Sequence, residues 1–191
     1  MKCFNCGRKA VICLDYIDRC YCRNCFLELL EQRLKKELRR TGFDSEKEYY
    51  MLETPTSWLA EFLLKKIFKD RLRIKKTKRM KNRDMIIPIY LEKYVSDFLG
   101  AMLEQEDPAM IIEKYHGENI YILKHFLWGE ISLAGKLLGI NPGKRESYGE
   151  VDILLEVFQG AHWNALFGAA NSIEKLAGMI KTSPRKKKKT G

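Results

Sequence analysis

The sequence has no long hydrophobic run. Its longest apolar stretches, such as residues 85–90, are far shorter than the roughly 20 residues that cross a bilayer. The N-terminal MKCFNC also lacks the apolar core of a secretory signal, because polar and cysteine residues come first. With 191 residues, 46% of them apolar, the chain has enough material for a core, and we expect a folded cytoplasmic protein.

Histidine is scarce, which leaves few candidates for acid–base catalysis. The three histidines are His116, expected in a loop, His125, among apolar neighbours, and His162, in a turn before Trp163. No two of them are close in sequence, and no serine stands in a G-x-S-x-G pattern. We expect structural roles for all three.

Positive charge is unevenly distributed along the chain, whose formal net charge is +10. Residues 1–43 carry 10 basic and 5 acidic side chains, residues 71–83 carry 8 basic and none acidic, and residues 181–189 carry 6 basic. The rest of the chain is acidic. This segregation is typical of proteins that bind polyanions, although solvated lysines also occur in many basic proteins.

All six cysteines fall within the first 25 residues, and beyond Cys25 there are none. Cys3, Cys6, Cys22 and Cys25 form two C-x2-C pairs separated by fifteen residues. Each pair fits one tight turn that aims both sulfurs at a common point about 2.3 Å away, so two turns complete a tetrahedral zinc site. Four thiolates leave no open coordination position, and we expect one structural Zn²⁺ per chain.

Other uses of these cysteines are weaker interpretations. Disulfides have little support in a chain without a signal peptide, and no βαβ pattern surrounds a redox C-x2-C motif. An iron–sulfur cluster also takes four thiolates and stays open. Cys13 and Cys20 are expected as small buried residues in a hairpin formed by residues 10–14 and 20–21. The second ligand pair then opens a helix over residues 26–40.

The stretch CFNCGRKAVICLDYIDRCYCRNCFLELLEQRLKKELRR resembles the N-terminal zinc finger of the TtuA-type tRNA 2-thiolation proteins. Those proteins continue into an ATP pyrophosphatase domain, whose phosphate loop SGGxDS lies between a strand and a helix. The resemblance is strong over residues 1–40 and faint from 48 to 181. It implies a treble-clef-like zinc finger in residues 1–43, a small, reduced PP-loop-like (Rossmann-like) α/β domain in residues 44–181, and a disordered basic tail in residues 182–191.

The position of the phosphate loop is occupied by Glu53-Thr-Pro-Thr-Ser57, which keeps only the final serine. A phosphate cradle needs glycines, so that backbone N–H groups can approach the anion. Here Pro55 has no N–H, and Glu53 would place a carboxylate against the pyrophosphate. We expect no ATP binding, and instead an ordinary helix start with Thr54 as N-cap and Pro55 at the first helical position.

Later landmarks of the family survive only as patterns. The segment that resembles GHNLDDxA reads Tyr90-Leu-Glu-Lys93 after an apolar strand, and the family's catalytic cysteines and C-terminal metal finger have no counterpart. Carboxylates such as Glu28, Glu31 and Glu37 are expected on helix faces, in pairs with nearby Arg33, Lys35 or Lys36. The chain therefore resembles a non-catalytic relative, a pseudoenzyme.

The basic run RLRIKKTKRMKNR from Arg71 begins with alternation, and we expect an edge strand that leads into a loop. Its charges either discourage edge-to-edge aggregation or contact RNA phosphates. The candidate RNA-contacting residues are Arg33, Lys36, Arg39, Arg40, Arg71, Arg73, Lys75, Lys76, Lys78, Arg79, Lys81, Arg83, Arg185 and Lys186.

The expected α/β domain has strands near residues 49–53, 71–75, 85–90 and 120–123. Helices are expected near 56–69, 91–106, 128–139, 149–160 and 164–180, with a largely parallel sheet. The function expected from the resemblance is a tRNA-binding or scaffolding subunit, with tRNA or another RNA and a catalytic thiolation paralogue as partners. A zinc-dependent protein adaptor without RNA, and a nucleotide-handling enzyme with an altered site, are the alternatives.

Overall fold

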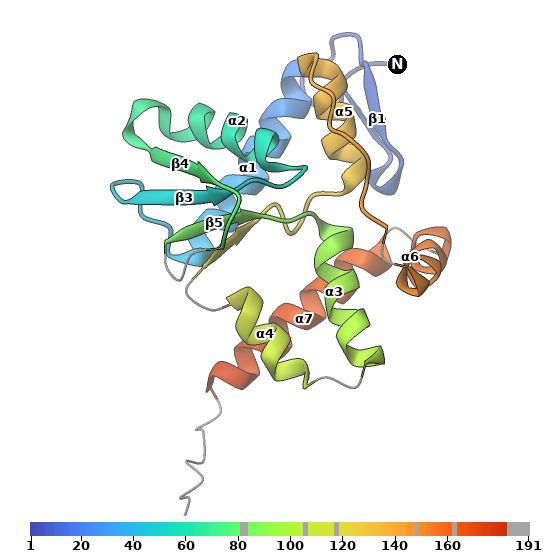
Figure 1. Cartoon of the computed structure of the whole chain (residues 1–191). Helices are drawn as coiled ribbons and strands as arrows, with labels where there is room; N and C mark the ends of the chain where they lie inside the picture. Colours follow the sequence, from blue (N-terminus) through green and yellow to red (C-terminus); the bar gives the residue numbers. More distant parts are fainter. Residues whose placement is uncertain (81–83, 105–106, 117–118, 148, 162–163, 183–191) are drawn as a thin grey trace, which may run out of the picture.

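The computed structural model describes the chain except residues 81–83, 105–106, 117–118, 148, 162–163 and 183–191 (Figure 1). The elements follow in the order β1 (Ile12–Leu14), β2 (Arg19–Tyr21), α1 (Arg23–Thr41), β3 (Glu48–Leu52), α2 (Ser57–Phe68), β4 (Arg73–Thr77), β5 (Met85–Pro88), α3 (Leu91–Leu103), α4 (Pro108–His116), β6 (Ile120–Ile122), α5 (Trp128–Leu138), α6 (Glu150–Ala161) and α7 (Asn164–Thr182).

The N-terminal module consists of an antiparallel hairpin, β1 and β2, followed directly by the long helix α1. Cys22 is the N-cap of α1, so the second ligand pair sits at the start of the helix, as the spacing predicts. The helix ends at Gly42, whose φ of 67° lies in the left-handed region that glycine adopts without strain. The hairpin-and-helix layout is the expected treble-clef-like arrangement.

The central sheet has four strands in the order β4-β3-β5-β6, and every pairing in it is parallel. The four predicted strands are present within two residues of their expected positions, and β4 is an edge strand as expected. Between β3 and β5 the strand order reverses. In open α/β sheets ligands bind at such a point, beyond the carboxyl ends of the strands.

Alternating side chains of the strands build one core on each face of the sheet. Ile86, Ile120 and Ile122 point toward the hairpin, α1, α2 and α5, whereas Met85 and Tyr121 point toward α3, α4, α6 and α7. Figure 1 shows the two groups of helices on either side of the strands. The result is the expected α/β architecture, with the finger helix α1 inside the first layer.

One helix was not expected. Residues 108–116 form α4, so the prediction that His116 lies in a loop was wrong. The preceding sequence EQEDP is polar and ends in proline, a pattern typical of a loop. The helix that begins at this proline has only about two and a half turns, so its periodicity is a weak signal. His162 lies outside the described residues.

Glu37 anchors the finger helix to the edge of the sheet. Its carboxylate accepts hydrogen bonds from the backbone N–H groups of Leu123 at 2.9 Å and Lys124 at 3.0 Å, directly after β6. The side chain is buried, and burial raises its pKa. The expectation that Glu37 pairs with a nearby lysine on the surface of its own helix was therefore wrong, whereas Glu31 does pair with Lys35 at 2.6 Å.

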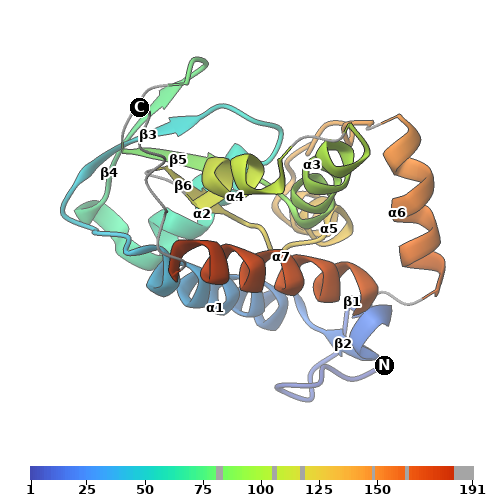
Figure 2. The same cartoon turned by 90° about the horizontal axis from the view of Figure 1, so that it is seen from below.

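A second cross-link joins the hairpin, α1 and α5. The Arg33 guanidinium donates to Glu130 at 2.7 Å and to the Tyr16 hydroxyl at 2.5 Å, and that hydroxyl donates to the same carboxylate. Burial raises the pKa of the Tyr16 hydroxyl, and the nearby negative charge of Glu130 adds a smaller effect in the same direction. These contacts fix the metal module against the α/β layer, and Figure 2 shows α1 lying alongside α7.

We expect Glu37→Ala to lower the free energy of unfolding by about 2–4 kcal/mol, because two buried N–H groups lose their acceptor. Urea denaturation followed by circular dichroism measures the change. Glu28→Ala, an exposed position on the same helix, is the matched control and should stay within about 0.5 kcal/mol of the unmodified protein. Equal stability of the two variants would contradict the anchoring role of Glu37.

Candidate metal centre and nucleic-acid surfaces

The four predicted ligands meet at one point. The sulfur atoms of Cys3, Cys6, Cys22 and Cys25 all lie within 4.8 Å of one another, and those of Cys6 and Cys22 are 3.6 Å apart. Thiolates at the vertices of a tetrahedron around one Zn²⁺ are separated by about 3.8 Å, given a Zn–S distance of about 2.3 Å. The donor set and its spacing therefore fit a single metal ion.

The surroundings of the four sulfurs differ. Burial raises the pKa of the Cys3 thiol, but backbone N–H groups of Cys22, Cys6 and Asn5 outweigh it and lower that pKa to about 6. At Cys25, burial and the neighbouring sulfurs together raise the pKa. Four thiols this close compete for negative charge, and a bound cation relieves that competition.

Cys13 and Cys20 do not belong to the metal cluster. They face each other across the hairpin with a Cα–Cα distance of 3.9 Å and form a disulfide. Cys13 is exposed and Cys20 is half-buried, so the expectation of two small buried residues was wrong. The reason is the strand alternation, which turns Ile12, Leu14 and Tyr21 inward and places the two cysteines on the outer face.

The turn at the switch point is closed by its own hydroxyl groups. Thr54 Oγ1 and Thr56 Oγ1 each donate to the carbonyl oxygen of Pro88 at 3.2 Å, linking the turn after β3 to the end of β5. Thr56 is only 1% exposed. The helix starts at Ser57 with Thr56 as N-cap, so the expected cap at Thr54 was wrong by two residues.

Two buried carboxyl groups at the carboxyl edge of the sheet were missed in the sequence. Glu92 follows β5 and accepts the backbone N–H of Trp128 at 3.0 Å, and Glu130 accepts that of Leu127 at 3.1 Å. Burial raises the pKa of Glu92 to about 7. The signal was present: an acidic residue in the first turn of the helix that follows a buried strand, and one at the third position of a helix.

The predicted RNA-contacting residues form two separate surfaces. Arg71, Arg73, Lys75, Lys76, Lys78 and Arg79 are exposed along or beside β4. Those on α1 are next to β6, at the other edge of the sheet, three strand spacings or about 14 Å away. Lys81, Arg83, Arg185 and Lys186 lie outside the described residues.

The cations within each surface are not equivalent. Lys36, Arg39 and Arg40 are exposed on α1, whereas Arg33 is engaged by Glu130 and Tyr16. Along β4, Lys75 pairs with Glu48 at 2.7 Å and Lys76 with Glu61 at 2.6 Å. Part of the β4 charge is therefore already neutralised within the protein.

The α1 surface borders a groove between α1 and α7, which holds two adjoining cavities. Both are lined by the C-terminal half of α1: the Lys36 cavity, of about 380 Å³, faces the N-terminal half of α7, and the Asn119 cavity, of about 310 Å³, faces its C-terminal half. Glu37, Arg40 and His125 line both. His125 contacts Glu174 at 3.2 Å, so this histidine has a charged partner that its apolar sequence neighbours did not indicate.

Comparison with known proteins gives a structural match only. No protein-family model and no curated protein matches the sequence. Among solved structures, the chain is similar to the U34-tRNA thiolase NcsA from Methanococcus maripaludis, determined with its 4Fe-4S cluster. The TM-score is 0.72 at 14% identity, over 93% of this chain and 87% of the other.

The chain has the fold of a tRNA thiolase. That confirms the α/β architecture implied by the resemblance, and the four N-terminal cysteines are placed where they could hold a metal ion. Identity of 14% establishes the fold alone. Among the described residues, none of the helices is long and apolar enough to cross a membrane.

We expect each of the single variants Cys3→Ser, Cys6→Ser, Cys22→Ser and Cys25→Ser to bind the metal much more weakly and to lose it on purification, since each removes one of the four thiolates of the tetrahedral site. Elemental analysis of the purified protein should give one zinc per chain, with no visible charge-transfer absorption. Cys13→Ser is the control on the same hairpin and should keep the full metal content. Equal metal loss in that control would contradict the assignment of ligands.

Glu92 should make the stability pH-dependent. Its pKa rises from 4.5 to about 7 on folding, so between these values the native state holds a proton that the unfolded chain has released. Stability therefore falls as the pH rises through this window. Between pH 5 and 8, Glu92→Gln should gain about 2–3 kcal/mol relative to the unmodified protein, as measured by denaturation at each pH. Glu28→Gln should show no such gain, and a flat difference for Glu92→Gln would refute the shift.

Proposed function

We propose that this protein is a non-catalytic zinc-binding subunit related to tRNA 2-thiolation enzymes. In this role it binds tRNA or another RNA and serves as a scaffold for an active thiolation partner. The observation that carries the proposal is the turn at the switch point, set in a fold shared with a tRNA thiolase. Where a phosphate would need free N–H donors, the hydroxyl groups of Thr54 and Thr56 bind the end of β5, and Pro55 between them has no N–H.

The chemistry of the cysteines supports the same conclusion. The cluster in the thiolase is a 4Fe-4S cluster, and this chain has no cysteine after Cys25 to hold one in its α/β domain. In such a cluster each thiolate binds a different iron, whereas the four sulfurs at the N-terminus lie within 4.8 Å, which suits one ion. A closed four-thiolate zinc site stabilises the fold and offers no position for a substrate.

The division of the chain follows from this assignment. Residues 1–43 would form the zinc finger with its basic helix, residues 44–181 a PP-loop-like domain without nucleotide, and residues 182–191 a basic tail that adds affinity without specificity. Exposed apolar side chains on α6, Ile153 at 64% and Val157 at 61%, support contact with a protein partner.

RNA binding is tested by retardation of tRNA on native gels at increasing salt. We expect affinity to fall steeply with salt, because each phosphate contact contributes about −0.7 to the slope of log K against log salt on single strands. The double variants Lys36→Ala with Arg39→Ala, and Arg73→Ala with Lys78→Ala, should each flatten the slope by about 1.4 if their surface contacts the backbone. A double variant of exposed glutamates, Glu28→Gln with Glu46→Gln, serves as the control.

The outcomes separate the candidate functions. Absence of salt-sensitive tRNA binding, together with capture of a protein partner, would favour a zinc-dependent adaptor. Saturable ATP binding in isothermal titration, weakened by Ser57→Ala, would favour an enzyme with an altered site and contradict the non-catalytic role. Co-purification of a thiolation enzyme or tRNA from native lysate would support the scaffold.

A further inference from the structure

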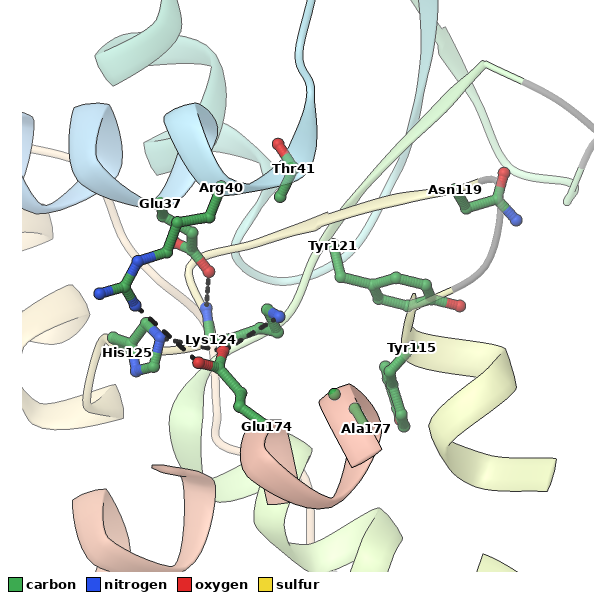
Figure 3. Close-up of a pocket in the computed structure, with 11 residues that line it drawn as sticks. Glu37, Arg40, Thr41, Tyr115, Asn119, Tyr121, Lys124, His125, Glu174 and Ala177 are labelled. Atoms are coloured by element: carbon green, nitrogen blue, oxygen red, sulfur yellow. Dashed lines mark hydrogen bonds and ion pairs between the residues drawn. The ribbon is translucent and has the colours of Figure 1, made fainter. Parts of the chain in front are cut away.

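The Asn119 cavity lies beside the free edge of β6, between the two layers of the protein. α1 contributes Glu37 and Arg40 to its lining, α7 contributes Glu174 and Gly178, and β6 with its flanking residues contributes Tyr121 and Lys124 (Figure 3). Its volume of about 310 Å³ is at the lower end of the range of about 300–1,000 Å³ for ligand sites. A ligand of this cavity is therefore small.

One polar atom in this cavity has no partner. The side-chain oxygen of Asn119 is buried, and no hydrogen-bond donor in the described part of the chain reaches it. A buried acceptor without a donor is unfavourable, so the site favours a ligand that brings an N–H group. An asparagine amide also pairs with an adjacent donor and acceptor on one edge of a nucleobase.

The charges around the cavity are balanced within the protein. Lys124 is almost fully buried and lies 3.3 Å from the Glu174 carboxylate, which also faces His125 at 3.2 Å and Arg40 at 3.9 Å (Figure 3). The hydrogen bond from His125, with the charges of Lys124 and His125, lowers the pKa of Glu174 to about 2. Since Lys124 and His125 already contact this carboxylate, the interior suits a neutral polar group better than a phosphate, whereas the Arg40 side chain is 56% exposed at the rim.

Aromatic side chains form one wall. The rings of Tyr115 and Tyr121 pack edge to face with centroids 4.7 Å apart, and Figure 3 shows Tyr121 between Asn119 and Tyr115. Proteins that bind single-stranded RNA hold unstacked bases against tyrosine rings and satisfy the base edges with amides and charged groups. The residue types of this cavity are those of such a site.

Phosphate groups have a place next to it. The adjoining Lys36 cavity adds Lys36 to the shared Arg40, with the amides of Asn164 and Asn171 on the α7 side. A nucleotide whose base entered the Asn119 cavity would leave its phosphate toward these two cations. Along the groove, the lining thus changes from the exposed cations Lys36 and Arg40 to the neutral amide of Asn119.

We infer that the Asn119 cavity binds a single unstacked nucleobase, with Asn119 pairing to its edge and Lys36 and Arg40 contacting the adjacent phosphate. The inference rests on the proposed RNA binding and assigns one base-binding site to that function. Two sources share this chemistry, a base of a bound RNA strand and a free nucleotide.

The test uses the full-length protein with a cavity-filling variant. Gly178 lines the cavity and a Cβ added there meets no heavy atom within 4 Å, so Gly178→Leu places a bulky side chain at the cavity wall without a clash and favours the helix. Gly168→Leu is the matched control, since Gly168 lies on the same helix, has equally open surroundings and lines neither cavity. Asn119→Ala is the second variant, because it removes the amide without filling the cavity.

Fluorescence anisotropy then measures binding of single-stranded octamers of uridylate, adenylate and cytidylate, and of an octamer without bases. We expect at least one base-containing octamer to bind about tenfold more tightly than the abasic one, as one stacked and hydrogen-bonded base would give. This ratio should persist in Gly168→Leu and disappear in Gly178→Leu and Asn119→Ala.

The remaining results distinguish the failures. Equal ratios in Gly178→Leu and Gly168→Leu would overturn the base site while leaving RNA binding intact. If no octamer binds, the proposed RNA binding is wrong, and titration with the four nucleoside monophosphates then tests whether the cavity binds a free nucleotide. Binding that is lost in Gly178→Leu but kept in Gly168→Leu would support a free nucleotide as the ligand. Absence of binding to any of the four would overturn the inference.

Discussion

The contact between the Glu37 carboxylate and the two backbone N–H groups after β6 determines how the metal module and the α/β domain are joined. A four-thiolate metal site would hold the hairpin and the first turn of α1 together, but it would not determine where the C-terminal half of this helix packs. Glu37 pins the C-terminal half of α1 to the edge strand of the sheet. Because α7 lies along the same edge, this one contact also creates the groove in which Arg40 meets Glu174.

Because α1 and α7 lie along β6, the two edges of the sheet differ. At β4 the outermost strand carries lysines and arginines, which keep water along the exposed backbone and discourage pairing with another chain. At β6 the edge is short and apolar, and α1 and α7 flank it instead. A positive surface therefore occurs at both edges for different reasons, one as a charged strand and one as a basic helix beside a groove.

The turn between β3 and α2 differs in composition from a glycine-rich phosphate loop. A phosphate loop directs unpaired backbone N–H groups at its ligand. The backbone conformation that this requires is strained for most residues, and glycine adopts it easily. In the turn after β3, the hydroxyl groups of Thr54 and Thr56 donate to the end of β5, and the residue between them is Pro55. Nearby, Glu92 and Glu130 cap the start of α5.

The sequence by itself determined the features whose residues are close together along the chain. The four cysteines that meet at one point, the hairpin, the strands and all helices but α4 follow from spacing and periodicity, because a turn or a strand is built from adjacent residues. Only the tertiary structure decided the partners of Glu37, Arg33 and His125, which lie as many as 97 residues away from them, and the outward disulfide of the hairpin. Such contacts depend on which elements pack against each other in the folded protein. The periodicity of a single helix predicts which of its faces is buried, but not which element covers that face.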